Sequence, residues 1–187
     1  MTLSPGQAAA ALDDIERTEQ RTRAARSYSA ASDYLLLWGV IWMIGYGACA
    51  VLPPERWGLA WLPLAAIGML VSFALGKRSR RQRGAGTGTS AQTAVMGLAI
   101  FAFIAAVYYL FQPRSHLPYL VFPSLVAGLV YTLAGAVAGM PRFIGIGAGI
   151  FVLTLAGYVA APQWTSLWVA IAGGGGLVLG GLWLRKA

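Results

Sequence analysis

Charged residues are scarce in this chain of 187 residues, of which 11% are charged and 58% are hydrophobic. A soluble domain carries about 25% charged residues. So few charges cannot give a chain this apolar a polar surface in water. The composition therefore excludes an ordinary soluble domain and predicts that lipid surrounds most of the chain.

Cysteine and histidine occur once each, as Cys49 and His116. A single cysteine excludes an intrachain disulfide, and one cysteine with one histidine makes a zinc site built from protein ligands implausible. We expect no metal and no cofactor. Arginine and lysine outnumber the acids, for a net charge of +8. Because they cluster at the ends of apolar runs, they predict contact with anionic lipid headgroups and no nucleic acid.

Six apolar segments follow one another after a polar start, each near the 20 or so residues that cross the hydrocarbon layer. They are residues 34–52, 57–76, 93–112, 118–139, 143–161 and 164–184. None of them contains an Asp, Glu, Lys or Arg. This absence counts against a proton-coupled carrier and against an intramembrane protease, so we expect that the chain is not an enzyme.

The basic residues predict the orientation of these spans. With the amino terminus inside, twelve of the 14 lysines and arginines fall on the inner side, and Arg56 and Arg114 fall outside. The inner ones are Arg17, Arg21, Arg23, Arg26, Lys77, Arg78, Arg80, Arg81, Arg83, Arg142, Arg185 and Lys186. This bias predicts a multi-pass protein of the cytoplasmic (inner) membrane with both termini in the cytoplasm.

Residues 1–32 are polar and favour a helix. Ser4 precedes Pro5 and Gln7 in a capping-box pattern, and acids precede bases along the segment. The apolar stripe is weak, which leaves two interpretations: a solvated helix that leads into the membrane, or a docking helix for a cytosolic partner or a neighbouring subunit. The expected fold is an all-α, six-transmembrane-helix bundle (residues 33–187) preceded by a cytosolic amphipathic helix.

Lys77, Arg78, Arg80, Arg81 and Arg83 begin a basic, glycine-rich cytoplasmic loop predicted over residues 77–92. This cluster is a candidate contact for lipid or for a protein partner. It is either a topological anchor alone or a lipid-pinned loop that an acidic partner releases.

Glycine spacing is the richest pattern inside the spans. Gly135–Gly139, Gly145–Gly149 and Gly176–Gly180 are pairs that let helices approach closely, within the chain or between copies in a homo-oligomer. The run Gly173, Gly174, Gly175 and Gly176 favours local unwinding. This run and Gly180 are therefore candidates for a solute pathway or for close packing.

The second, fourth and sixth segments are each followed by basic residues, so the spans also allow an arrangement as three parallel hairpins. Two functions from different classes remain. The first is a non-enzymatic membrane subunit or regulator that acts through helix packing, its cytoplasmic helix and its basic loop. The alternative is a small transporter or channel for a neutral or weakly polar solute, with the glycine-rich sixth helix lining the path.

Overall fold

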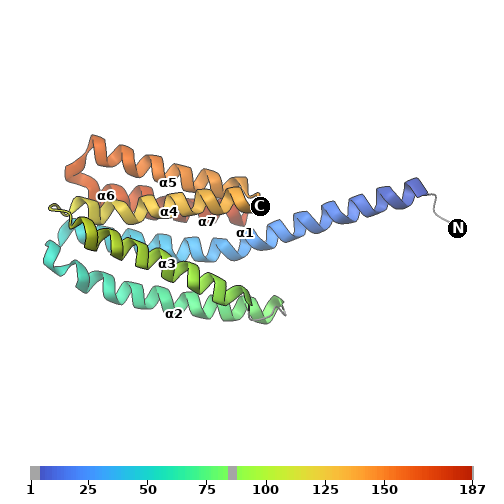
Figure 1. The fold of residues 1–187 in the computed structure, drawn as a ribbon, viewed down its shortest axis with the longest axis horizontal. Coiled ribbons are helices and arrows are strands. Elements are labelled where there is room, and N and C mark those ends of the chain that lie inside the picture. The colour runs from blue at the N-terminus through green and yellow to red at the C-terminus, as the bar shows by residue number, and fades with distance from the viewer. Residues whose placement is uncertain (1–4, 84–87, 187) are drawn as a thin grey trace.

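The computed structural model describes residues 5–83 and 88–186, and these residues form a bundle of helices without a strand (Figure 1). The elements are α1 (Pro5–Val51), α2 (Trp57–Arg83), α3 (Gly88–Phe111), α4 (Leu117–Ala138), α5 (Pro141–Ala160), α6 (Thr165–Val169), a π-helical segment η3 (Ala170–Gly175) and α7 (Gly176–Arg185). Short 3-10 turns, Pro54–Arg56 and Pro162–Trp164, precede α2 and α6.

Within the described residues, five helical stretches are long and apolar enough to cross a membrane. They are Ala31–Val51, Pro54–Arg78, Leu117–Ala138, Pro141–Ala160 and Pro162–Arg185. The remaining predicted span, 93–112, lies in α3, whose apolar part Val95–Phe111 is shorter. The chain thus folds as a helical membrane bundle, as the sequence predicts.

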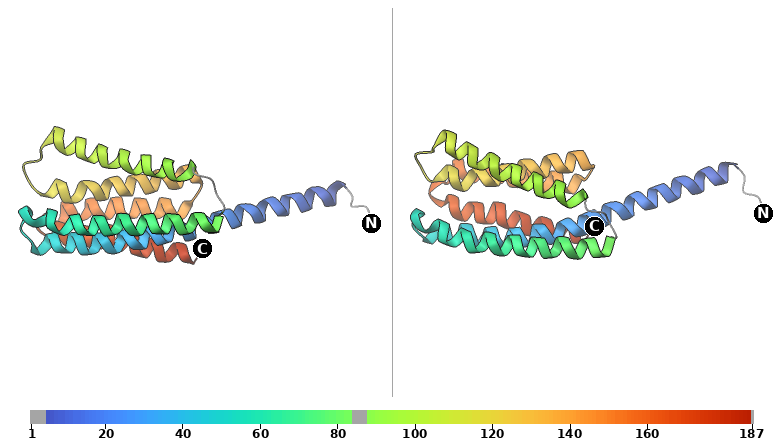
Figure 2. Two further views of the ribbon diagram at one scale, coloured as in Figure 1. Left: turned by 90° about the horizontal axis from the view of Figure 1, so that it is seen from below. Right: turned by 60° about the horizontal axis from the view of Figure 1, so that its bottom comes forward.

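Helix α1 continues without a break through the predicted domain boundary at residue 33. Its first half projects alone from one end of the bundle (Figures 1 and 2). Among the side chains that the structure describes, Tyr28 is the first that is buried, and it stacks on Phe143 of α5 with 6.3 Å between ring centroids. The predicted cytosolic helix and the first span are therefore one continuous rod.

One end of the bundle, which we call the basic end, carries Lys77, Arg78, Arg142, Arg185 and Lys186. The carboxyl end of α2, the α4–α5 junction, the carboxyl terminus and the projecting part of α1 all meet there (Figure 1). The other end carries the turn before α2, the α3–α4 loop and the turn before α6. Five of the twelve basic residues predicted on the inner side thus lie at the basic end, and Arg56 and Arg114 lie in the connections at the other end.

The tightest helix pairs are α4 with α5 and α1 with the last span. Neither is one of the three predicted hairpins. Helix α2 packs chiefly on α1, and α3 touches α4 only lightly. The core therefore consists of α1, α4, α5 and the α6–η3–α7 span, and the packing does not follow a threefold repeat of hairpins.

Aromatic side chains of α1 hold α2 in place. The indole of Trp38 donates a hydrogen bond to Ser72 Oγ at 3.2 Å, and the Tyr34 hydroxyl donates to the Ser72 carbonyl at 3.3 Å. Further along, Trp61 packs edge-on against Tyr46 and donates to the sulfur of Cys49 at 3.3 Å. Polar groups in lipid need such partners, because no water satisfies them there.

Polar contacts at the basic end join the first span to the last span. Ser32 Oγ donates to the carbonyl of Gly181 at 2.8 Å, and Arg185 donates to Ser32 Oγ at 3.2 Å. Arg185 also forms an ion pair with Asp33 at 2.8 Å. These bonds fasten α7 to α1 just where α1 leaves the bundle.

A proline explains a hydrogen bond between α3 and α4. Pro123 lies inside α4 and has no N–H, so the carbonyl of Tyr119 loses its partner within the helix. The Tyr108 hydroxyl of α3 donates to this carbonyl at 3.1 Å, and the two tyrosine rings lie 4.6 Å apart. The kink-prone site of α4 is therefore also the attachment site of α3.

We predict that Tyr108→Phe loosens α3 from α4 and lowers the free energy of unfolding by about 1 kcal/mol, the usual contribution of one hydrogen bond. Amide hydrogen exchange in α3 should become faster. Tyr109→Phe is the matched control, because the Tyr109 side chain is 77% exposed. Equal exchange rates in both variants would show that the bond does not hold α3.

Candidate functional site

The last span changes its helical winding at the glycine run. Helix α6 ends at Val169, the π-helical segment covers Ala170–Gly175, and α7 resumes at Gly176. The Gly176 N–H points to the carbonyl of Ile171, five residues back, which is the π pattern. The run therefore widens one turn without interrupting the helix. Such π turns are rare and are frequently found at functional sites.

At this turn the last span crosses α1 with the two backbones in contact. A Cβ placed on Gly174 would lie 2.7 Å from the backbone nitrogen of Met43 and 2.9 Å from the carbonyl oxygen of Gly39. A Cβ placed on Gly39 would lie 2.8 Å from the Gly174 carbonyl oxygen. Only residues without a side chain allow so short an approach.

The other candidate glycines have different surroundings. A Cβ on Gly173 would lie 2.9 Å from Ser124 Oγ, and one on Gly180 would lie 2.9 Å from the Ile146 side chain. A Cβ on Gly176 would lie 3.0 Å from Ile150, and one on Gly175 would meet nothing within 4 Å. Gly173, Gly174, Gly176 and Gly180 thus contact neighbouring helices, whereas Gly175 has free space beside it.

Next to Gly173 lies a buried pair of hydroxyl groups. Ser124 Oγ of α4 and Thr154 Oγ1 of α5 are 2.9 Å apart, and both side chains are 0% exposed. One hydroxyl donates a hydrogen bond to the other, and this bond offsets the free-energy cost of placing both groups in an apolar interior. This pair thus places two hydroxyl groups, one from α4 and one from α5, beside the π turn at the centre of the bundle.

The basic cluster differs from its predicted form. Residues 77–83 continue α2 to Arg83, and α3 begins at Gly88, so most of the predicted loop 77–92 is helical. Lys77 and Arg78 are exposed at the basic end. The side chains of Arg80, Arg81 and Arg83 lie outside the described residues. The structure brings neither Lys77 nor Arg78 into contact with the glycine run.

The close contact between α4 and α5 uses Gly135, which the four-residue spacing singled out, because a Cβ there would lie 2.7 Å from a backbone nitrogen of α5. It also uses Gly128 and Gly147, which that spacing did not single out. A Cβ on Gly128 would lie 2.8 Å from the Gly147 carbonyl oxygen. By contrast, Gly139 ends α4 in the left-handed conformation with φ 64°, and the Cβ position of Gly149 has no neighbour within 4 Å. Spacing along one helix identifies glycines that share a face, but the partner helix decides which face is used.

Within residues 5–83 and 88–186, His, Cys, Asp and Glu side chains form no group of three that would bind a metal ion. Comparison of the chain with protein-family models, with curated proteins and with solved structures finds no match.

We predict that Gly174→Ala destabilises the bundle by about 1–3 kcal/mol, because the new methyl group meets backbone atoms that cannot move aside. Gly175→Ala, one residue later in the same run, should change the stability by less than about 0.5 kcal/mol. Thermal unfolding in a mild detergent measures both. If the two variants melt at the same temperature, the contact between α1 and the π turn does not limit stability.

Proposed function

We propose that this chain is a non-enzymatic subunit or regulator of the cytoplasmic (inner) membrane, with both termini in the cytoplasm, that acts through protein contacts. The basic end supports the orientation, since clusters of lysine and arginine stay on the cytoplasmic side. In that orientation the projecting half of α1 stands in the cytoplasm.

The continuity of α1 carries this proposal. Residues 5–27 form a rod about 35 Å long, at 1.5 Å per residue, and the same helix supplies core residues of the bundle. Leu35 is 2% exposed and Ile41 is 4% exposed. A cytosolic partner that turned or pulled the rod would therefore act directly on the helix that contacts the π turn at Gly39.

The lipid-facing sides of α2 and α3 give further support. They expose large side chains such as Leu62, Phe73, Phe101 and Phe111. Helix α2 contacts the core chiefly through α1, and α3 touches it lightly, which leaves most of their surface to lipid or to the helices of a membrane partner. A second copy of the chain is one such partner.

Affinity purification in mild detergent tests the proposal, with the full chain compared with a variant that lacks residues 5–27. The full chain should retain a protein partner, and the deletion variant should lose it while its melting temperature stays unchanged. If the full chain always purifies alone, and the deletion changes no phenotype, the proposal fails.

A coupling variant sharpens this test. Insertion of Gly-Ser-Gly between Ala24 and Ala25 interrupts the rod outside the bundle. In the parent, partner binding should slow amide hydrogen exchange in residues 35–46. In the insertion variant the partner should still bind, but exchange in these residues should stay as fast as without the partner. If exchange slows equally in the parent and in the insertion variant, the rod transmits nothing.

The second candidate is a carrier for a neutral or weakly polar solute, and the observation that favours it is the Ser124–Thr154 hydroxyl pair beside the π turn. Ser124→Ala with Thr154→Val should then lower solute flux in proteoliposomes while the melting temperature is kept. A Gly174→Leu variant would not test this candidate, because the added side chain would disturb the packing of the last span against α1. If the parent shows no flux of glycerol or urea, this candidate loses its support.

A further inference from the structure

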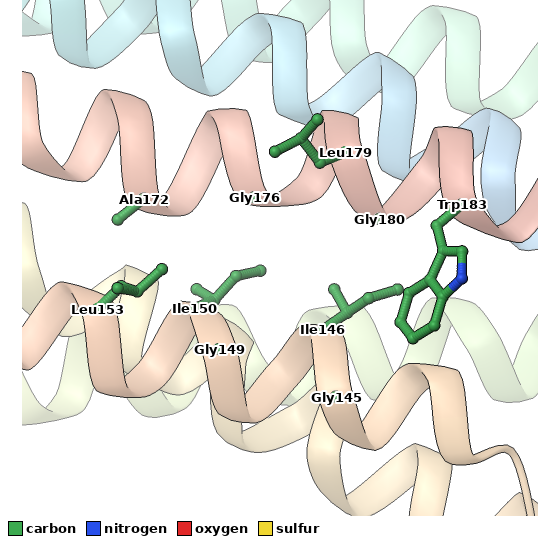
Figure 3. A pocket seen from close by; sticks show the side chains of 10 residues that line it. All are labelled: Gly145, Ile146, Gly149, Ile150, Leu153, Ala172, Gly176, Leu179, Gly180 and Trp183. Atoms are coloured by element: carbon green, nitrogen blue, oxygen red, sulfur yellow. The ribbon is translucent and has the colours of Figure 1, made fainter.

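A lateral groove of about 350 Å³ runs between α5 and the last span (Figure 3). Its walls are apolar throughout and consist of Gly145, Ile146, Gly149, Ile150, Leu153, Ala172, Gly176, Leu179, Gly180 and Trp183. Leu179 on its rim is 69% exposed, so the groove opens sideways, toward lipid. Figure 3 shows the Trp183 ring at one end of it.

The length of the groove along the helices matches the thickness of one leaflet. It follows α5 over residues 145–153 and the last span over residues 172–183, which are about 12 Å and about 16 Å at 1.5 Å per residue. Half of the hydrocarbon layer is about 15 Å thick. The groove thus runs from the basic end to the middle of the last span, where the π segment lies.

A positive charge without an acidic partner stands at its mouth. Arg142 is one turn before Gly145 and donates to the Trp183 carbonyl at 3.2 Å. Its guanidinium lies over the rings of Tyr28 and Trp183, 5.8 Å and 5.5 Å from their centroids. Among the described residues no carboxylate pairs with Arg142, whereas nearby Arg185 is paired with Asp33.

We propose that this groove holds one acyl chain of an anionic phospholipid whose phosphate binds Arg142. A planar guanidinium pairs well with phosphate oxygens, and a tryptophan at the end of a span marks the interface where headgroups lie. A transmembrane helix from a second copy would need a groove through both leaflets. This groove ends at Leu153 and Ala172, so an acyl chain is the better occupant.

Native mass spectrometry of the full chain tests the proposal, with phosphatidylglycerol and phosphatidylcholine of the same acyl chains as probes. The parent should retain one phosphatidylglycerol in preference to phosphatidylcholine. Arg142→Gln should lower this preference about fivefold, the factor that one basic residue contributes near an anionic lipid. Arg78→Gln removes the same charge at the basic end, away from the groove, so only its general contribution to headgroup contact is lost and the preference should fall by clearly less.

A second variant tests the groove itself. Gly149→Leu adds a side chain where the Cβ position has no neighbour within 4 Å, so the protein should keep its melting temperature and lose retention of both lipids. Equal retention of the two lipids by the parent overturns the proposal. Equal losses of lipid preference in Arg142→Gln and Arg78→Gln would also overturn it, because they would indicate an effect of surface charge alone. A dimer that Gly149→Leu dissociates would overturn it as well, because a second copy would then occupy the groove.

Discussion

The contact between the backbones of α1 and the last span, at Gly39 and Gly174, is the constraint on which the other packing depends. Lipid tails are as apolar as the side chains of a span, so water does not drive helices together inside a bilayer. Close packing and hydrogen bonds must do so. The glycine crossing supplies the first, and the Ser32 and Arg185 bonds nearer the basic end supply the second.

This crossing divides the molecule into a firm part and a loosely attached part. Helices α4 and α5 join the core through their own glycine contact at Gly128 and Gly147. Helix α3 depends on a few aromatic contacts and on the carbonyl that Pro123 leaves free. The elements that face lipid most broadly are thus those held least firmly, as expected for surfaces that meet changing neighbours.

Arg142 connects the two proposals in space. Its guanidinium lies over Tyr28, the residue at which α1 leaves the bundle, and over Trp183, at the end of the lateral groove. A lipid phosphate at Arg142 would therefore sit beside the base of the projecting rod. Lipid composition and a cytosolic partner would act on the same junction of α1, α5 and α7.

The sequence by itself determined the class of protein, the places of five apolar spans and the charge asymmetry between the two ends of the bundle. Hydropathy and charge are local properties, so segments such as 118–139 and 143–161 are visible without knowledge of their neighbours. The tertiary structure alone decided that α1 pairs with the last span and α4 with α5, that Gly39 and Gly128 are contact glycines, and that Arg142 stands at the mouth of a groove. A span that is apolar on every side has no periodic pattern to mark its packing face, so its partners depend on how all the helices fit together.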